Sequence, residues 1–264
     1  MSTRWVNRRH FLTLPLALVL APWAGAWAEV QARKASYTAD VGVLYDLLTF
    51  HLAGTVLENV DRAAGRYDVT IAGQGAKIAN RIESHGRLIG GRWAPVRTSA
   101  SFQVAGRDSR SDVAYDWERR TIDYHARAET FFLRRLRAVD DTVAIPPGQY
   151  VDDAVSAMLN HADGQWPAGP DGRLHTFVVR RRRSEKEGPD DVETSYRAEL
   201  VPFVLSLGTD ASGAATAQID MTRFSSWARA DQPARVVFGP SRRPSRIASS
   251  LILGTSIAIR FTDT

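Results

Sequence analysis

The side chains best suited to chemistry are six histidines and three adjacent pairs of aspartates. The histidines are scattered, and no two have the spacing of a helical or strand metal site, so zinc would need ligands from distant segments. Adjacent residues on a strand point to opposite faces, so the two carboxylates of an aspartate pair would not converge on one ligand. Solvated positions in turns or at a helix cap explain these pairs better than acid–base catalysis or calcium binding does. We therefore expect no metal and no cofactor. The aspartate pairs are Asp140–Asp141, Asp152–Asp153 and Asp190–Asp191.

Catalytic motifs are absent from the sequence. It contains no G-x-S-x-G elbow, no H-E-x-x-H pair and no phosphate-binding loop. It also contains no cysteine, which excludes disulfides, thiolate metal sites, a cysteine nucleophile and an acylated lipoprotein cysteine. The sequence therefore leans against an enzyme, although a site assembled from distant residues stays open.

Two arginine runs are candidates for binding anions. Arg180 to Arg183 form one run, and a second lies around Arg134 and Arg135. Guanidinium groups bind phosphate or anionic lipid headgroups with two parallel hydrogen bonds. The alternative is a solvated hairpin end, because five acidic residues between positions 185 and 193 follow the first run. The candidate anion ligands are Arg134, Arg135, Arg180 and Arg182.

Aromatic side chains are concentrated in the first half of the chain. If the sheet that carries them curls, its concave face could line a ligand cavity. They could equally fill the core, as aromatic side chains do in most β domains. The candidates for the cavity, with one methionine from a predicted helix, are Tyr45, Tyr67, Trp93, Phe102, Tyr115, Trp117, Tyr124 and Met158.

Residues 1–28 have the three regions of a secretory signal: a basic start, an apolar stretch and an A-x-A pattern that ends at Ala28. Arg8 and Arg9, followed by His-Phe-Leu, resemble the twin-arginine export motif. We predict export through the twin-arginine translocase, cleavage by signal peptidase and a soluble mature protein in the periplasm. The alternative is an uncleaved anchor, although Pro15 and Pro22 interrupt the apolar stretch.

Net charge gives little support for nucleic-acid binding. The chain carries +5, but the leader holds three arginines and no acidic residue, so its removal leaves +2. A nearly balanced surface lacks the basic footprint that nucleic-acid binding needs. We expect no nucleic-acid partner.

Period-two alternation is clearest between residues 111 and 126. Val113 and Tyr115 alternate with acidic residues, and Ile122 and Tyr124 continue the pattern after a short polar segment. This pattern predicts an antiparallel hairpin with one buried aromatic face. Further strands are predicted at residues 66–71, 99–104, 174–181, 193–207, 215–222, 234–238 and 250–261, with a tight hairpin turn at Gly90–Gly91.

Three further segments lead to specific expectations. Residues 41–52 are apolar on both faces, which predicts a strand covered on both sides, followed by a turn or bulge at Ala53–Gly54 and a returning strand over residues 55–60. Residues 76–82 could form a short helix. After Pro146–Pro147, the residues Val151, Val155, Met158 and Leu159 fall on one helical face and predict a helix that covers the open end of the sheet. The polar residues of this segment should face away from the sheet: Asp152, Asp153, Ser156 and Asn160.

The expected fold is mainly β: an antiparallel meander that forms a curled sheet, barrel or sandwich, with one or two short helices. Its organisation would be a signal peptide over residues 1–28, a tether over residues 29–38 and a single β domain over residues 39–261.

Several short motifs, in order, resemble the bacterial family known as domain of unknown function 3108. The resemblance covers roughly residues 37 to 261. It implies an exported, mostly antiparallel β protein and brings no established activity or catalytic residues. The chain departs from the family pattern between residues 181 and 195, a charged insertion that lacks the family's Pro-Ala-Gly-Thr-Phe stretch. The motifs are Tyr45 with Ala53-Gly54, Arg81-Ile82-Glu83-Ser84, Tyr115-Asp116-Trp117, Pro147-Gly148 with Asp153-Ala154-Val155-Ser156-Ala157, Asp171-Gly172-Arg173, Pro244-Ser245-Arg246-Ile247 and Gly254-Thr255.

Three functions stay open at this point. The first is a non-enzymatic carrier or chaperone for a lipid or other amphiphile in the cell envelope. The second is a hydrolase that acts on envelope glycans or esters. The third is an assembly or scaffold protein of the envelope. The absence of a catalytic constellation favours the first over the second.

Overall fold

The computed structural model describes residues 31–263, except positions 44, 46, 131, 185, 186, 189, 226 and 227. The predicted leader and its cleavage after Ala28 therefore lie outside the described residues.

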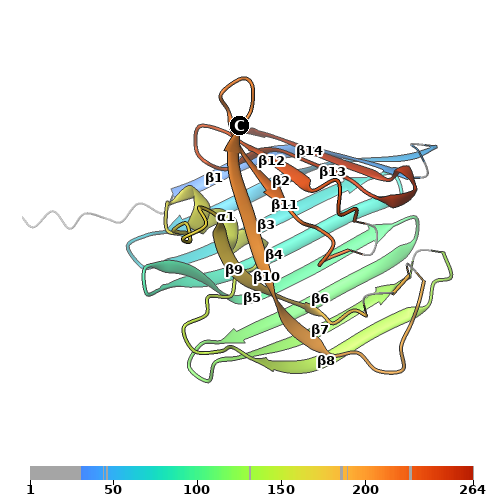
Figure 1. The fold of residues 1–264 in the computed structure, drawn as a ribbon, viewed down its shortest axis with the longest axis horizontal. Coiled ribbons are helices and arrows are strands. Elements are labelled where there is room, and N and C mark those ends of the chain that lie inside the picture. Colours follow the sequence, from blue (N-terminus) through green and yellow to red (C-terminus); the bar gives the residue numbers. More distant parts are fainter. Residues whose placement is uncertain are drawn as a thin grey trace, which may run out of the picture.

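The described chain forms a single antiparallel sheet of 14 strands in the order β8-β7-β6-β5-β4-β3-β2-β1-β14-β13-β12-β11-β10-β9 (Figure 1). Two meanders, β1–β8 and β9–β14, join where β1 pairs with β14. The strands are β1 (Gln31–Val43), β2 (Leu48–Asp61), β3 (Arg66–Gly75), β4 (Ile78–Ile89), β5 (Arg92–Val104), β6 (Arg107–Asp116), β7 (Thr121–Glu129), β8 (Leu136–Ala144), β9 (Leu174–Arg181), β10 (Ala198–Thr209), β11 (Ala215–Ile219), β12 (Ala234–Phe238), β13 (Pro244–Ser250) and β14 (Ser256–Asp263).

The sheet curls until its two edges approach each other, which makes a nearly closed barrel. In Figure 1, β10 crosses in front of the strands β5 to β7. At the seam, Asp141 accepts a hydrogen bond from the backbone N–H of Ala198 (2.8 Å) and pairs with Arg197 (3.1 Å). Val139 packs there against Tyr196 and Ala198. The prediction of a mainly β, antiparallel fold is confirmed, and the architecture is a barrel.

The hairpin predicted from residues 111–126 is β6 and β7. Val113, Tyr115 and Ile122 are buried, as the alternation requires. They pack against Phe177 and Val179 of β9 on the other side of the barrel. The aromatic face of the first meander therefore meets the second meander.

The helix α1 (Ala154–Ala162) lies at one end of the barrel (Figure 1). Asp153 caps it: its carboxylate accepts the N–H of Ser156 (2.6 Å), and its own N–H donates to Ser156 Oγ (3.0 Å). A helix between the two meanders is thus confirmed, but the predicted separation into an apolar and a polar face is wrong. The expected outward residues Asp152, Asp153, Ser156 and Asn160 are all buried, and Val151 precedes the helix, in a bridge with Phe177.

The segment 41–52 is not a strand covered on both sides. It contains the end of β1, a turn and the start of β2, and Tyr45 (82% exposed) and Leu47 (79% exposed) lie in that turn. Gly54 lies inside β2 rather than in a turn. A Cβ at Gly54 would come within 2.6 Å of the Tyr37 ring, so glycine is required there for close packing.

Residues 76–82 do not form a helix. Lys77 adopts a positive φ of 60° in the turn between β3 and β4, and β4 begins at Ile78. Further along β4, the buried residues Ser84 and Gly86 alternate with the exposed residues His85 and Arg87, which fits a strand with one buried face. A short 3-10 helix, η1 (Ile252–Gly254), lies instead between β13 and β14.

The second meander differs from the prediction mainly in its boundaries. β10 begins at Ala198 rather than at residue 193, and β11 ends at Ile219. β13 was not predicted, and the predicted strand over 250–261 is η1 followed by β14.

The first meander also differs from the prediction at both of its ends. β8 was not predicted. β1 already begins at Gln31, within the segment 29–38 for which we predicted a tether.

Candidate ligand cavity inside the barrel

Small side chains on neighbouring strands leave the middle of the barrel hollow. Ala100, Ser111 and Ala126 are register partners on β5, β6 and β7. Ser111 shares the inward face of β6 with the buried Val113 and Tyr115, because residues two apart on a strand point the same way. Two cavities adjoin this position, and Ser111 lines both of them.

The first cavity, of 510 Å³, lies between the two meanders and α1. Tyr115 and Tyr124 contribute to the wall from the first meander, and Met158 contributes from the helix. The opposite wall is apolar and comes from the second meander: Phe203, Leu205, Ile219, Val236, Phe238 and Ile247.

The second cavity, of 430 Å³, extends from Ser111 to the ends of β1 and β5. Val43 and Val104, the last residues of these strands, line it, together with Phe102 and Ile257. Both volumes fall in the range of about 300–1,000 Å³ that is typical of small-molecule sites. The interior can therefore hold an apolar group of considerable length.

A buried polar network joins α1 to the barrel wall. Asp152 pairs with Arg92 of β5 (2.7 Å) and accepts hydrogen bonds from Thr176 Oγ1 (2.6 Å) and Asn160 Nδ2 (3.0 Å). Asn160 in turn bonds both the N–H and the C=O of Trp93 (2.8 Å each). Burial raises the pKa of Asp152 despite the opposing charge of Arg92. The network fixes the helix against the start of β5.

Asp153 places a carboxylate at the floor of the first cavity. Besides capping the helix, it accepts hydrogen bonds from Ser84 Oγ (2.5 Å) and Thr98 Oγ1. Tyr115 lies close by, and burial followed by the charges of Asp153 and Asp152 raises the pKa of the Tyr115 phenol. The phenol therefore stays protonated and can act as a hydrogen-bond donor next to the cavity.

Two buried polar atoms on the cavity walls lack a partner among the described residues. They are Nδ1 of His161, in the first cavity, and Oγ1 of Thr255, in the second. The His161 ring lies 4.3 Å from that of Phe238, and burial, followed by the charge of Arg242, lowers the pKa of His161. Buried polar groups normally have hydrogen-bond partners, so these two atoms are positions for polar groups of a ligand or for water.

The eight predicted cavity residues divide between the cavity, the core and the surface. Phe102, Tyr115, Tyr124 and Met158 line the two cavities. Tyr67 and Trp93 instead form a T-shaped pair in the core, with ring centroids 5.8 Å apart. Trp117 stacks on Tyr115 and donates to the Pro95 carbonyl (2.6 Å). Tyr45 lies in the exposed turn between β1 and β2, so it does not line the interior.

The predicted anion ligands do not come together in a single site. Arg180 pairs with Glu199 (2.6 Å), and Arg182 lies 3.5 Å from the same carboxylate. Arg134 and Arg135 lie in the turn between β7 and β8, where Arg134 contacts Glu129 (3.3 Å). The first run is thus partly neutralised, whereas the second lies at an exposed turn.

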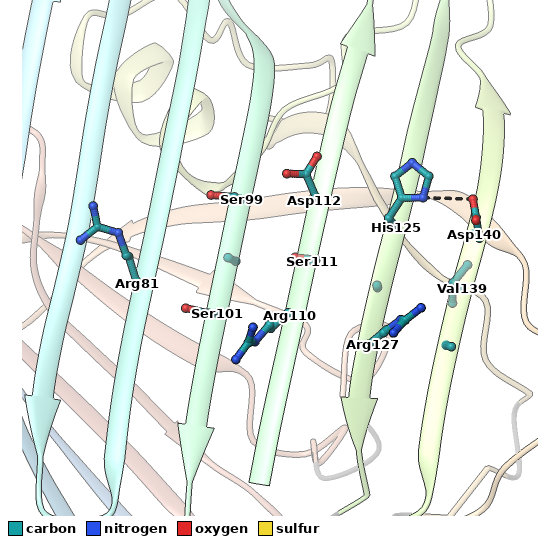
Figure 2. A pocket seen from close by; sticks show the side chains of 13 residues that line it. Arg81, Ser99, Ser101, Arg110, Ser111, Asp112, His125, Arg127, Val139 and Asp140 are labelled. Atoms are coloured by element: carbon teal, nitrogen blue, oxygen red, sulfur yellow. Dashed lines mark ion pairs between the residues drawn. The ribbon is translucent and has the colours of Figure 1, made fainter. Parts of the chain in front are cut away.

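A broad, polar hollow of 520 Å³ lies on the outer face of β4 to β8 (Figure 2). Arg81, Ser101, Arg110 and Arg127 are successive register partners across β4, β5, β6 and β7. The carboxylates on the neighbouring row are paired: Asp112 with Arg97 (2.9 Å) and Asp140 with His125 (3.0 Å). The hollow lacks the buried, converging groups of the interior, which we therefore take as the candidate site.

Sequence reasoning missed the polar floor and the second wall of the cavity. The spacing of Asp153 and Ser156 is a signal that could have indicated the cap. The alternation of Phe203 and Leu205 could have indicated an inward face of β10. The partners Ser84, Thr98 and Arg92 lie 55 to 69 residues from the aspartates that they bind, and no local pattern indicates these contacts.

No group of histidine, aspartate and glutamate side chains among the described residues could hold a metal ion. In the same part of the chain, no helix has the length and apolar character needed to cross a bilayer.

Comparison with known proteins leaves the family open. No family model matches the chain, and no curated protein matches it. The chain is similar to the crystal structure of a β-barrel-like protein of domain of unknown function DUF1849 from Brucella abortus. The similarity covers 89% of this chain and 97% of that chain, at 8% sequence identity and a TM-score of 0.42. The fold described above rests on the strand pairing of this chain itself.

Proposed function

We propose that this protein is an exported, non-enzymatic carrier that holds the apolar part of a lipid or other amphiphile inside its barrel. The observation that carries the proposal is the pair of apolar cavities, of 510 and 430 Å³, that meet at Ser111. Each CH₂ group moved from water into such a cavity contributes about 0.8 kcal/mol to binding. An alkyl chain would gain considerable affinity from filling both cavities.

Polar atoms on the walls favour a ligand with a hydrogen-bonding group over a pure hydrocarbon. His161 Nδ1 and Thr255 Oγ1 are buried and have no partner among the described residues. A hydroxyl, ester or amide of a ligand could complete the hydrogen bonding of either atom. The resulting hydrogen bond would orient the ligand, since leaving a buried polar atom unpaired costs about 1–3 kcal/mol.

Export is the second part of the proposal and rests on residues 1–28. The twin-arginine pair Arg8 and Arg9 would direct the folded protein to the periplasm, where lipids must cross an aqueous space between membranes. Arg8→Lys combined with Arg9→Lys should leave full-length precursor in the cytoplasm. Unchanged export in a strain that lacks the twin-arginine translocase would contradict this part of the proposal.

The test of carriage is native mass spectrometry of the mature protein purified without detergent from its own cells, followed by organic extraction. We expect a reproducible mass above that of the polypeptide, and an amphiphile of the same mass in the extract. The protein after extraction serves as the control and should show the polypeptide mass alone. A polypeptide mass with no extractable amphiphile would contradict the proposal.

A further inference from the structure

The two ends of the barrel differ. At one end, α1 and its flanking residues contact the start of β5: Asn160 bonds Trp93, and Asp163 pairs with Arg62 in the turn after β2 (2.8 Å). The opposite end carries the turns that follow β1, β3, β5 and β7, since these strands run in the same direction in the meander. We call the end with these four turns the mouth end. The 430 Å³ cavity reaches it, because Val43 and Val104 are the last residues of β1 and β5.

The four most exposed large hydrophobic side chains of the described chain are all at the mouth end. Tyr45 (82% exposed) and Leu47 (79%) lie in the turn after β1. Leu133 (59%) and Leu136 (60%) lie in and beside the turn after β7. Phe132, in the same turn as Leu133, is also exposed. The two turns are separated by β3 to β6 in the sheet, so they form two apolar tips on the rim of the same end, and exposed apolar surface of this kind marks sites that bind a protein or a membrane.

Basic side chains accompany these apolar tips. Arg134 and Arg135 are exposed beside Leu133, and Lys77 is exposed in the turn after β3, which lies between the two tips in the strand order. Two carboxylates adjoin the turn after β7: Glu129 pairs with Arg134 (3.3 Å), and Asp190 accepts backbone N–H groups of the turn. Neither Arg135 nor Lys77 forms an ion pair among the described residues, so these two side chains can meet anionic headgroups. Arginine and lysine next to exposed leucine and phenylalanine match the charge and apolar depth of a bilayer with anionic headgroups.

Several backbone N–H groups of the turn after β7 are hydrogen-bonded within the protein. Asp190 accepts the N–H groups of Phe132 (3.0 Å) and Leu133 (2.6 Å). The N–H of Thr130 donates to the carbonyl of Arg135 (2.8 Å), and the N–H of Arg135 donates to Thr130 Oγ1 (2.9 Å). Unsatisfied backbone groups are costly in an apolar phase, and these four N–H groups all have partners, two within the turn and two on the Asp190 carboxylate.

We propose that the mouth end docks onto a bilayer with anionic phospholipid headgroups, with the side chains of Tyr45, Leu47, Phe132, Leu133 and Leu136 inserted among the headgroups. This inference rests on the proposed function, because a carrier must exchange its ligand with a membrane. Docking in this orientation places the 430 Å³ cavity next to the lipid and α1 on the far side.

The experiment is flotation of the mature protein with vesicles of phosphatidylcholine alone or mixed with phosphatidylglycerol. The parent should float with the mixed vesicles and much less with the neutral ones. Leu133→Asp should lower the vesicle partition coefficient at least about tenfold, since it removes an exposed leucine that would insert into the bilayer and adds a negative charge. Arg135→Gln should reduce the preference for anionic vesicles.

The matched control is Leu207→Asp, the same change at an exposed leucine (45%) on β10, beyond the Leu205–Leu174 pair and near the α1 end. It should float like the parent. A parent that does not float, a Leu133→Asp variant that floats like the parent, or a parent dimer that Leu133→Asp dissociates would each overturn the docking surface. Binding of a soluble fluorescent fatty acid, measured without vesicles, tests the carrier separately. The affinity for the fatty acid should be equal in the parent and in the three variants, Leu133→Asp, Arg135→Gln and Leu207→Asp. A parent that binds the fatty acid but does not float would therefore refute the docking proposal and leave the carrier proposal standing.

Discussion

Asp152 and Arg92 form a buried ion pair at 2.7 Å, with their side chains 2% and 7% exposed. The pair joins the residue that precedes the cap of α1 to the first residue of β5. Burying two charges is unfavourable unless both are paired and hydrogen-bonded, and here Ser156, Asn160 and Thr176 supply the further bonds to Asp152. Arg92 Nε has no partner among the described residues, but the guanidinium lies over the Tyr150 ring, 4.3 Å from its centroid. The pair therefore makes the position of the helix, and with it the closed end of the cavity, specific.

Removing one partner of this pair should destabilise the protein strongly. Arg92→Met leaves the Asp152 carboxylate buried without its counter-charge, which costs about 3–5 kcal/mol. Urea titration of the parent, Arg92→Met, Asp152→Asn and the double variant measures this cost. The double variant should be less destabilised than the sum of the two single variants. Additive losses would show that the two side chains act independently.

His161 should make stability depend on pH. Burial lowers its pKa from the usual 6.5, so the unfolded chain takes up a proton, below that pH, that the folded chain does not. The contribution of neutral His161 is therefore fully present above pH 6.5 and is lost as the pH falls. His161→Gln should flatten the fall of unfolding free energy between pH 7.5 and 5.5. A slope equal to that of the parent would contradict this assignment.

Leu159 and Met158 are neighbours on α1 with different environments. Leu159 is fully buried in the core beside Tyr67 and Trp93, whereas Met158 lines the 510 Å³ cavity. Leu159→Ala should cost about 2–5 kcal/mol in unfolding free energy. Met158→Ala should cost clearly less but should change the affinity for a fluorescent fatty acid, because it enlarges the cavity. Equal costs in urea titration, with unchanged fatty-acid affinity, would show that Met158 belongs to the core.

Alternation was the most informative part of the sequence, and it predicted β6 and β7 correctly because one face of that hairpin is buried against β9. It failed at residues 41–52 for a physical reason. Tyr45 and Leu47 are apolar residues exposed in a turn, and local hydrophobicity cannot distinguish exposed apolar tips from a strand covered on both sides. The same two residues now contribute to the proposed docking surface.

The candidate site was predictable only in part. Tyr115, Tyr124 and Phe102 were found because aromatic residues on one face of a curling sheet point to its interior. Asp152 and Asp153 were expected to be solvated, since a pair of aspartates before a helix is typical of an exposed cap. Their burial depends on Arg92, Ser84 and Thr98, which the curl of the sheet brings to the helix from distant positions in the sequence.

The interior cavity is tested most directly by filling it. Ser111 lines both cavities, whereas Ser99 on the neighbouring strand lines the outer hollow and neither cavity (Figure 2), so Ser111→Phe and Ser99→Phe make the same change on opposite faces of the sheet. The measurement is the equilibrium dissociation constant for a fluorescent fatty acid. We expect saturable binding by the parent, the same constant for Ser99→Phe, and binding at least about tenfold weaker for Ser111→Phe, equivalent to about 1.4 kcal/mol. Absence of saturable binding by the parent, or equal affinities for the two folded variants, would contradict a carrier that holds its ligand inside the barrel.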